Sequence, residues 1–291
     1  MREKPVFRKI IDFEEVKQLI EQMRRDRGFS SGYKDWDRLS GGLVRDGVTL
    51  IAARPAMGKT SLALNIVSRL SKRLDGTILI FSPNLRSREI TIRLLNIGTG
   101  LEASQLLDGS KSAEEITDKC ADFFQSQKGN VQIETLTAPS LENIWRRCCR
   151  IPDLQLLVIN NIERICKPYE ESLPDVPWDE NYEPKDKVLD YLKVLAKELR
   201  VPVLCTTHLH RSLERRKNKR PHLGDLKKIG YSAELIDQIV FLYRDQYYDP
   251  EGREGAELIV AKVAQGDVGT VRTDWDYATL RFLERGKMNE S

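Results

Sequence analysis

The chain has 291 residues, 40% of them hydrophobic and 31% charged, which suits a folded domain with a sizeable core and excludes a disordered chain. Its formal net charge of +3 does not by itself indicate nucleic-acid binding, so any basic surface must be local. No apolar run is long enough to span a membrane, and the basic start lacks the apolar core of a signal peptide. Five scattered cysteines at no ligand spacing predict reduced thiols, and we expect a cytoplasmic protein without membrane contact.

A basic leader over residues 1–30 precedes one large predicted domain over residues 31–291. Apolar residues at helical spacing within the leader predict an amphipathic helix over residues 12–25. The apolar side of such a helix needs a partner. That partner is either the core of its own domain or a neighbouring subunit, and the pattern does not decide between them.

The first motif with chemical meaning is a phosphate-binding loop. It reads Ala53-x-x-x-x-Gly58-Lys59-Thr60, a P-loop with alanine at the first glycine, between a buried strand over residues 48–52 and an amphipathic helix. Gly58 lets the backbone close on a phosphate, Lys59 neutralises the β- and γ-phosphates, and the Thr60 hydroxyl ligates Mg²⁺. The sequence therefore predicts a site for ATP and Mg²⁺. The residues assigned to the nucleotide are Ala53, Arg54, Pro55, Ala56, Met57, Gly58, Lys59, Thr60 and Ser61.

Strands and helices alternate through the next part of the chain. Strands are predicted over residues 77–81, 131–135, 154–159 and 201–205, and helices over residues 86–97, after Ser112, after Ser140 and over residues 188–199. Gly76 and Gly98 are predicted to end the helices before them, and Ser112 with Glu115 to form a capping box. This alternation predicts an α/β fold with a doubly wound, mostly parallel sheet. From Gln238 onward, QIVFLY, ELIVAKV, VGTVRTDW and TLRFL follow without helices and predict antiparallel strands at one edge.

A basic segment over residues 211–220 reads RSLERRKNKR and is followed by two further lysines. Lysine and arginine without interleaved aromatic residues indicate contact with DNA phosphates, although a solvated surface loop has the same composition. The candidate DNA-contacting residues are Arg215, Arg216, Lys217, Lys219, Arg220, Lys227 and Lys228. His208, His210 and His222 have no acidic or thiol partner at ligand spacing, so we expect no metal site there.

Five strings make the chain resemble one family: GYKDWDRLSGGL, IAARPAMGKTSLALNIV, KVLAKELRVPVLC, RPHLGDL and FLYRDQYYDP. They are similar to the C-terminal ATPase domain of the bacterial replicative DNA helicase, DnaB, from about Gly32 to the C-terminus. The resemblance implies a RecA-like P-loop NTPase fold, a hexameric ring and translocation on single-stranded DNA. It implies that residues 224–230 form a channel loop and that residues 12–25 match the linker helix, whereas we expect no counterpart of the N-terminal collar domain.

Carried over residue by residue, the resemblance predicts a weakened catalytic centre. The family holds Mg²⁺ with an aspartate where this chain has Asn160, and orients the attacking water with a glutamate where it has Asn84. Its arginine finger follows a lysine by two residues, and here Lys262 is kept while Ala264 replaces the arginine. His208 replaces the glutamine that senses the γ-phosphate. An amide holds Mg²⁺ weakly and cannot act as a base near neutral pH.

We therefore expect ATP binding to persist and hydrolysis to be weak or lost, unless Glu163 or Glu89 supplies a displaced carboxylate. The favoured hypothesis is a DNA-binding, hydrolysis-poor paralogue of the replicative helicase, acting as a homo-hexamer or in a mixed ring with such a helicase. The alternative is an active ATP-dependent helicase that translocates on single-stranded DNA. A third hypothesis, another RecA-like ATPase such as a recombinase or clock-type protein, is disfavoured by FLYRDQYYDP and the C-terminal strand pattern.

Overall fold

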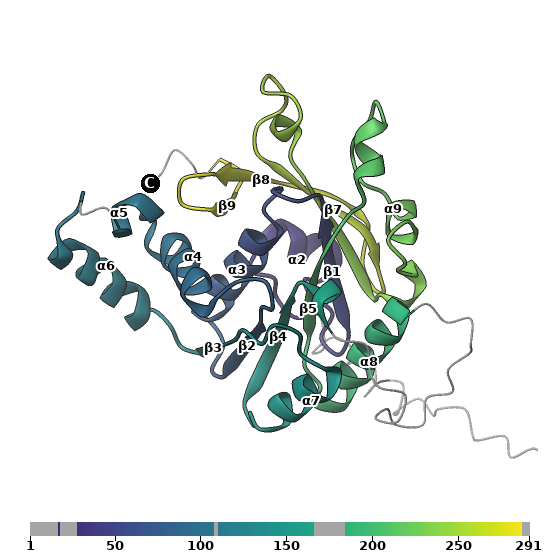
Figure 1. The fold of residues 1–291 in the computed structure, drawn as a ribbon, viewed down its shortest axis with the longest axis horizontal. Helices are drawn as coiled ribbons and strands as arrows, with labels where there is room; N and C mark the ends of the chain where they lie inside the picture. Colours follow the sequence, from purple (N-terminus) through teal and green to yellow (C-terminus); the bar gives the residue numbers. More distant parts are fainter. Residues whose placement is uncertain (1–16, 18–27, 108–109, 166–183, 287–291) are drawn as a thin grey trace, which may run out of the picture.

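A single sheet organises the computed structural model, which describes residues 17, 28–107, 110–165 and 184–286. Among these residues the sheet has nine strands in the order β3-β2-β4-β5-β1-β6-β7-β8-β9 (Figure 1). The strands are β1 (Val48–Ala53), β2 (Thr77–Phe81), β3 (Asn130–Glu134), β4 (Leu154–Asn160), β5 (Val203–His208), β6 (Gln238–Tyr243), β7 (Ala256–Val263), β8 (Gly269–Asp276) and β9 (Arg281–Glu284). The leader helix predicted over residues 12–25 lies outside the described residues, except for Lys17.

Helices cover both faces of this sheet (Figure 1). They are α2 (Lys34–Ser40), α3 (Lys59–Leu70), α4 (Ser87–Thr99), α5 (Ala103–Leu107), α6 (Ala113–Gln125), α7 (Leu141–Cys149), α8 (Pro184–Leu199) and the short α9 (Gly224–Lys227). Successive residues of β1 enter opposite cores: Leu50 packs with residues of α7 and α8, and Ile51 packs with residues of α3 and α4. Burial on both faces explains why β1 is a continuous apolar run. No helix within the described ranges has the length and apolar character needed to cross a membrane.

The predicted mostly parallel α/β sheet with antiparallel edge strands is confirmed, but the direction of one strand was predicted wrongly. β6, the QIVFLY segment, pairs parallel with β1, with Thr49 opposite Gln238 and Ala52 opposite Phe241. The antiparallel part begins only with β7, which pairs with β6, and continues through β8 and β9. All six residues of β6 are buried, as expected for a strand inside a parallel sheet. The chain from β5 returns to the other end of the sheet through α9 and short 3₁₀ turns, so the absence of a long helix was a misleading signal.

Two helix-end predictions also need correction. α3 ends at Leu70 rather than continuing toward Gly76. α4 runs through Gly98 and ends before Gly100, whose φ of 73° is the left-handed conformation that glycine favours. Gly98 instead makes room for a neighbouring helix, because a Cβ there would lie 2.2 Å from the ring of Phe123.

The capping box predicted at the start of α6 forms only in part. The Ser112 hydroxyl accepts a hydrogen bond of 3.1 Å from the backbone N–H of Glu115. The Glu115 carboxylate pairs with Lys111 rather than completing the box. Ser140 caps α7 as predicted, by accepting a hydrogen bond from the Asn143 N–H.

Candidate functional site

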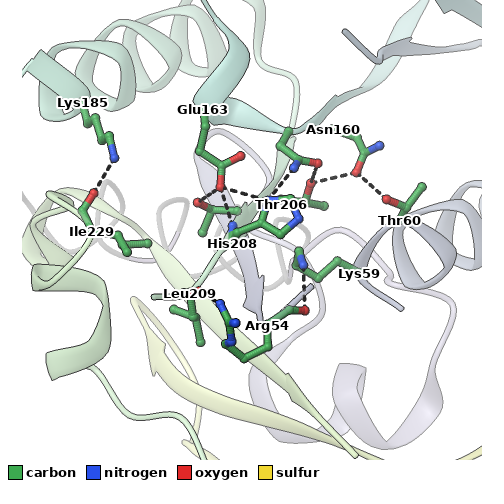
Figure 2. Close-up of polar contacts among 12 residues, drawn as sticks. Arg54, Lys59, Thr60, Asn160, Glu163, Lys185, Thr206, His208, Leu209 and Ile229 are labelled. Atoms are coloured by element: carbon green, nitrogen blue, oxygen red, sulfur yellow. Dashed lines mark hydrogen bonds and ion pairs between the residues drawn. The ribbon is translucent and has the colours of Figure 1, made fainter. Parts of the chain in front are cut away.

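The phosphate-binding loop lies in the middle of the sheet, between the end of β1 and the start of α3. Parallel strands end at the same edge, so the ends of β4 and β5 lie beside this loop. Ala53 is level with His208, and Asn160 is level with Thr206. Figure 2 shows that Lys59, Thr60, Asn160 and His208, which are far apart in the sequence, meet at this edge.

The loop owes its shape to two residues with left-handed backbone conformations. Ala56 has φ of 61° and Gly58 has φ of 101°. A Cβ on Gly58 would lie 3.0 Å from the Phe282 ring, so both the conformation and the close approach require glycine. Ala53, which occupies the position of the first glycine of the motif, is the last residue of β1, and this position accommodates a side chain. The substitution in the motif therefore leaves the loop intact.

Lys59 is aimed across the loop. Its side chain is buried, and Nζ donates a hydrogen bond of 3.0 Å to the backbone carbonyl of Arg54. Burial is the main cause that lowers the pKa of Lys59 to about 8, while Glu163 raises it and Arg54 lowers it further. An anion bound in the loop would offset this desolvation, which is the situation of a phosphate-binding lysine.

Thr60 and Asn160, the two residues predicted to meet Mg²⁺, are in contact. The Thr60 hydroxyl donates a hydrogen bond of 3.0 Å to Asn160 Oδ1, which also accepts one of 2.8 Å from Thr206. Asn160 Nδ2 donates to the Ser82 hydroxyl over 3.4 Å. The protein thus offers the metal two neutral oxygens. They fit a magnesium ion that is already held by nucleotide phosphates better than an ion held by the protein alone.

Asn84 lies in the turn after β2, with its side chain exposed. It lines an open cavity of ≈ 640 Å³ whose other lining residues include Arg54, Asn161, Glu163 and His208. The structure therefore brings Asn84 to the edge of the same site. The cavity combines amides, an imidazole and a carboxylate beside the phosphate-binding loop.

Glu163 contributes a carboxylate to the lining of this cavity. Its Oε1 accepts hydrogen bonds from the backbone N–H of His208 and, over 2.7 Å, from the Thr207 hydroxyl. Burial alone would raise the pKa of Glu163, but hydrogen bonds from His208 and Thr207 lower it to about 2. The group is therefore ionised near neutral pH. Glu89, by contrast, accepts a hydrogen bond of 2.7 Å from the Arg86 N–H and caps α4.

His208 ends β5 beside these groups. Its Nδ1 lies 2.8 Å from Asn161 Nδ2 and 3.4 Å from Glu163 Oε1. The imidazole is thus fixed on one side by the residues that follow β4. It lies at the edge of the cavity that Arg54, Asn84 and Glu163 also line.

Lys262 and Ala264 lie at the other end of the sheet. Lys262 pairs with Ile239 near the start of β6, whereas Lys59 follows the end of β1. Lys262 Nζ donates to the backbone carbonyls of Ala233, Glu234 and Ile236 at 2.6–3.0 Å. The structure does not bring these two residues to the chain's own phosphate-binding loop.

Two residues beside the loop had no role predicted from the sequence. Arg244 Nη2 donates a hydrogen bond of 2.9 Å to the Ala56 carbonyl, and its guanidinium lies 5.1 Å from the centre of the Trp275 ring. Trp275 also reaches Gly58, with a ring carbon 3.6 Å from where a Cβ would lie. Arg244 belongs to the string FLYRDQYYDP, which the sequence analysis singled out. Its contact with Trp275 on β8 could not be predicted from the sequence.

The predicted DNA-contacting residues divide into two groups. Arg216 pairs with the buried Asp225 over 2.9 Å, and Arg220 pairs with Glu257 over 2.7 Å while lying 4.8 Å from the centre of the Tyr243 ring. These two arginines hold the local fold. Lys228 lies 3.6 Å from Asp225, and Lys219 lies over Tyr248. Arg215, Lys217 and Lys227 are exposed and form no ion pair with other residues in the described ranges.

Comparison with known proteins identifies the family. The family model for the DnaB-like helicase C terminal domain matches residues 28–284. The replicative DNA helicase DnaC of Bacillus subtilis (strain 168) is 28% identical over 280 residues, covering 94% of this chain and 60% of the relative. The replicative DNA helicase DnaB of Geobacillus stearothermophilus is 29% identical over 265 residues, covering 89% of this chain and 57% of the relative. The chain thus spans little more than half the length of these relatives.

Solved structures agree with this assignment. A DnaB-like replicative helicase studied for its interactions with primase superposes with a TM-score of 0.79 at 26% identity, covering 95% of this chain and 67% of that one. A second solved structure, of an ATPase domain, superposes with a TM-score of 0.79 at 28% identity, covering 93% of this chain and 97% of that one. The chain therefore belongs to the DnaB-like helicase C-terminal domain family and has the RecA-like fold of its ATPase domains.

Proposed function

We propose that this chain is an ATP-binding domain of a DnaB-type replicative DNA helicase in which ATP hydrolysis is weak or lost. The observation that carries the proposal is the contact between Thr60 and Asn160. It combines an intact phosphate-binding loop with an uncharged amide at the end of β4. Binding and hydrolysis of ATP would thereby be separated.

ATP binding rests on the loop and its neighbours. The amides of residues 54–61 and the start of α3 would receive the phosphates, with Lys59 as the cation. Thr60 and Asn160 would complete the shell of a Mg²⁺ ion carried by the nucleotide. The Arg244 guanidinium lies over the Trp275 ring at the side of the loop, and these two side chains would contact the base.

Weak hydrolysis is expected from the residues at the positions of the general base and the arginine finger. Loss of an arginine finger costs about 10³ to 10⁵ in kcat, and loss of a general base about 10² to 10⁴. Asn84 has no basic site near neutral pH, and Ala264 has no charge to offer. Lys262 and Ala264 lie opposite the phosphate-binding loop, so in a ring they would face a neighbouring subunit. Such a ring would be a homo-hexamer or a mixed ring with a replicative helicase.

DNA binding would use the exposed part of the basic surface. Arg215, Lys217 and Lys227 can reach phosphates of single-stranded DNA without giving up an ion pair to another described residue. An active helicase is the second candidate function, and the ionised carboxylate of Glu163 in the cavity is the observation that favours it.

Titration with a fluorescent ATP analogue and measurement of phosphate release test the proposal together. The purified protein is expected to bind the analogue in the presence of Mg²⁺, and Lys59→Ala is expected to abolish this binding. Single-stranded DNA is expected to add little to phosphate release. Turnover at the rate of an ordinary helicase would favour the active alternative, and absence of binding would contradict both.

A further inference from the structure

We propose that Arg54 is a positioning residue that fixes the basic segment to the phosphate-binding loop, so that ATP and single-stranded DNA bind with linked affinities. The basic segment here means residues 211–220. The inference rests on the proposed function, because it requires both ligands to bind. It adds a physical connection between the two sites within one chain.

The first part of this connection is the Arg54 side chain. Arg54 follows β1 directly, so its backbone belongs to the loop, but its guanidinium leaves the loop toward the chain after β5. Nη1 donates a hydrogen bond of 2.7 Å to the Leu209 carbonyl, and Nε pairs with Glu214 Oε1 over 2.8 Å. Figure 2 shows the guanidinium reaching Leu209. Only 17% of the side chain is exposed, so the two contacts are largely shielded from water.

The second part is the segment that Arg54 holds. Leu209 is also bound to the loop strand by its own N–H, which donates a hydrogen bond of 3.0 Å to the Ala53 carbonyl. Leu213 is buried within the 3₁₀ turn Arg211–Arg215. The exposed Arg215 and Lys217 follow Glu214 closely. A shift of Glu214 by one hydrogen-bond length would therefore move the residues proposed to meet DNA.

The third part is the link to the nucleotide. Lys59 Nζ donates to the Arg54 carbonyl over 3.0 Å. A bound triphosphate competes for this ammonium group, so nucleotide binding alters the bonding of the residue whose side chain holds Glu214. Lys59, Arg54 and Glu214 form a continuous chain of contacts from the phosphate position to the basic segment. Linkage of this kind is reciprocal, since each ligand must change the affinity of the other by the same factor.

The test measures, in the full chain, the factor by which each ligand changes the affinity of the other. The affinity of a fluorescent ATP analogue is measured with and without oligo(dT), and the affinity of labelled oligo(dT) with and without a non-hydrolysable ATP analogue. The wild-type protein is expected to show the same factor, about fivefold or more, in both directions. Glu214→Gln removes the charge partner of Arg54 and is expected to reduce the factor below about twofold while ATP affinity without DNA stays unchanged. Arg54→Met is expected to reduce the factor equally, and the double variant no further.

Arg146→Met is the matched control. It also removes an arginine from an ion pair, with Glu142 on α7, away from the phosphate-binding loop. The control is expected to keep the wild-type factor. If the ion pair between Arg54 and Glu214 only stabilised the fold, Glu214→Gln would lower the thermal stability and leave the linkage factor between ATP and DNA unchanged. This result would overturn the inference. If the wild-type protein binds both ligands without linkage, the inference fails and the proposed function stands. If it binds neither ligand, both fail.

Discussion

The Thr60 hydroxyl lies 3.0 Å from Asn160 Oδ1, across the gap between the start of α3 and the end of β4. The same amide oxygen accepts a hydrogen bond from a second hydroxyl, that of Thr206 on β5. Three neighbouring elements are thus joined at the proposed metal position through a group without charge. Asn160 therefore offers no negative charge that would hold Mg²⁺ independently of the nucleotide.

Replacing the amide of Asn160 with a carboxylate is expected to make nucleotide binding depend more strongly on Mg²⁺. In Asn160→Asp the two hydroxyls can still donate to the side chain, so the fold should tolerate the change. The negative charge should tighten Mg²⁺ binding, and chelation of Mg²⁺ should then weaken nucleotide binding more in the variant than in the wild-type protein. Titrations of an ATP analogue with and without Mg²⁺ measure this difference. Asn143→Asp, an exposed change on α7, is the control and should behave like the wild-type protein.

Nucleotide affinity is expected to depend on pH through Lys59. Since its pKa is about 8, the ammonium form that neutralises phosphate is present below pH 8 and is lost as the pH rises above it. The affinity for ATP should fall by up to about tenfold between pH 7 and pH 9. Equilibrium titration across this range measures the effect. Lys59→Arg stays charged throughout, so a similar fall in that variant would show that another group is responsible.

Glu163 is expected to contribute to stability in a pH-dependent way. Its pKa is lowered from 4.5 to about 2, so the contribution is complete above about pH 4.5 and is lost as the pH falls toward 2. The shift corresponds to roughly 3 kcal/mol of unfolding free energy. Urea denaturation between pH 6 and pH 2.5 should show a smaller acid-induced loss for Glu163→Gln than for the wild-type protein. Equal losses would contradict the hydrogen bonds assigned to this carboxylate.

Much of the site could be predicted because it depends on local sequence or on the shared edge of parallel strands. The phosphate-binding loop is contiguous, and Asn160 ends an apolar run, so a parallel sheet had to bring it near Thr60. The contacts of Glu163 could not be predicted, because they depend on how the chain turns after β4 and β5. The ion pair between Arg220 and Glu257 could not be predicted either, because it joins residues 37 positions apart.

The two groups of basic residues are expected to respond differently to substitution. Replacing Arg215, Lys217 or Lys227 with alanine should weaken binding to oligo(dT) and reduce the slope of log K against log[salt] by about 0.7 for each phosphate interaction removed, with the fold unchanged. Arg220→Ala should instead destabilise the protein by about 1–3 kcal/mol, because it leaves the nearly buried Glu257 without this partner. DNA titrations at several salt concentrations, together with thermal melts, separate these effects. A salt slope unchanged in all three alanine variants would exclude this surface from DNA binding.

The glycine of the loop offers a test of the site that does not depend on charge. Gly58→Ala places a Cβ against Phe282 at φ of 101°, and is expected to cost about 1–3 kcal/mol of stability and to weaken ATP binding severely. Gly286→Ala is a matched control, because Gly286 also has a positive φ, 88°, but no atom of the described residues beyond its chain neighbours lies within 4 Å of the added Cβ. The control should retain ATP affinity. Full ATP affinity in Gly58→Ala would contradict the assignment of the loop.

The central claim, that the site holds ATP but scarcely cleaves it, is tested most directly by following bound ATP to ADP. Radiolabelled ATP is bound to excess protein with Mg²⁺ and oligo(dT), and the ADP formed is measured over time. The wild-type chain is expected to retain ATP, whereas the triple variant Asn84→Glu, Asn160→Asp and Ala264→Arg is expected to convert it. Rapid conversion by the wild-type chain, or no gain in the triple variant, would contradict the account.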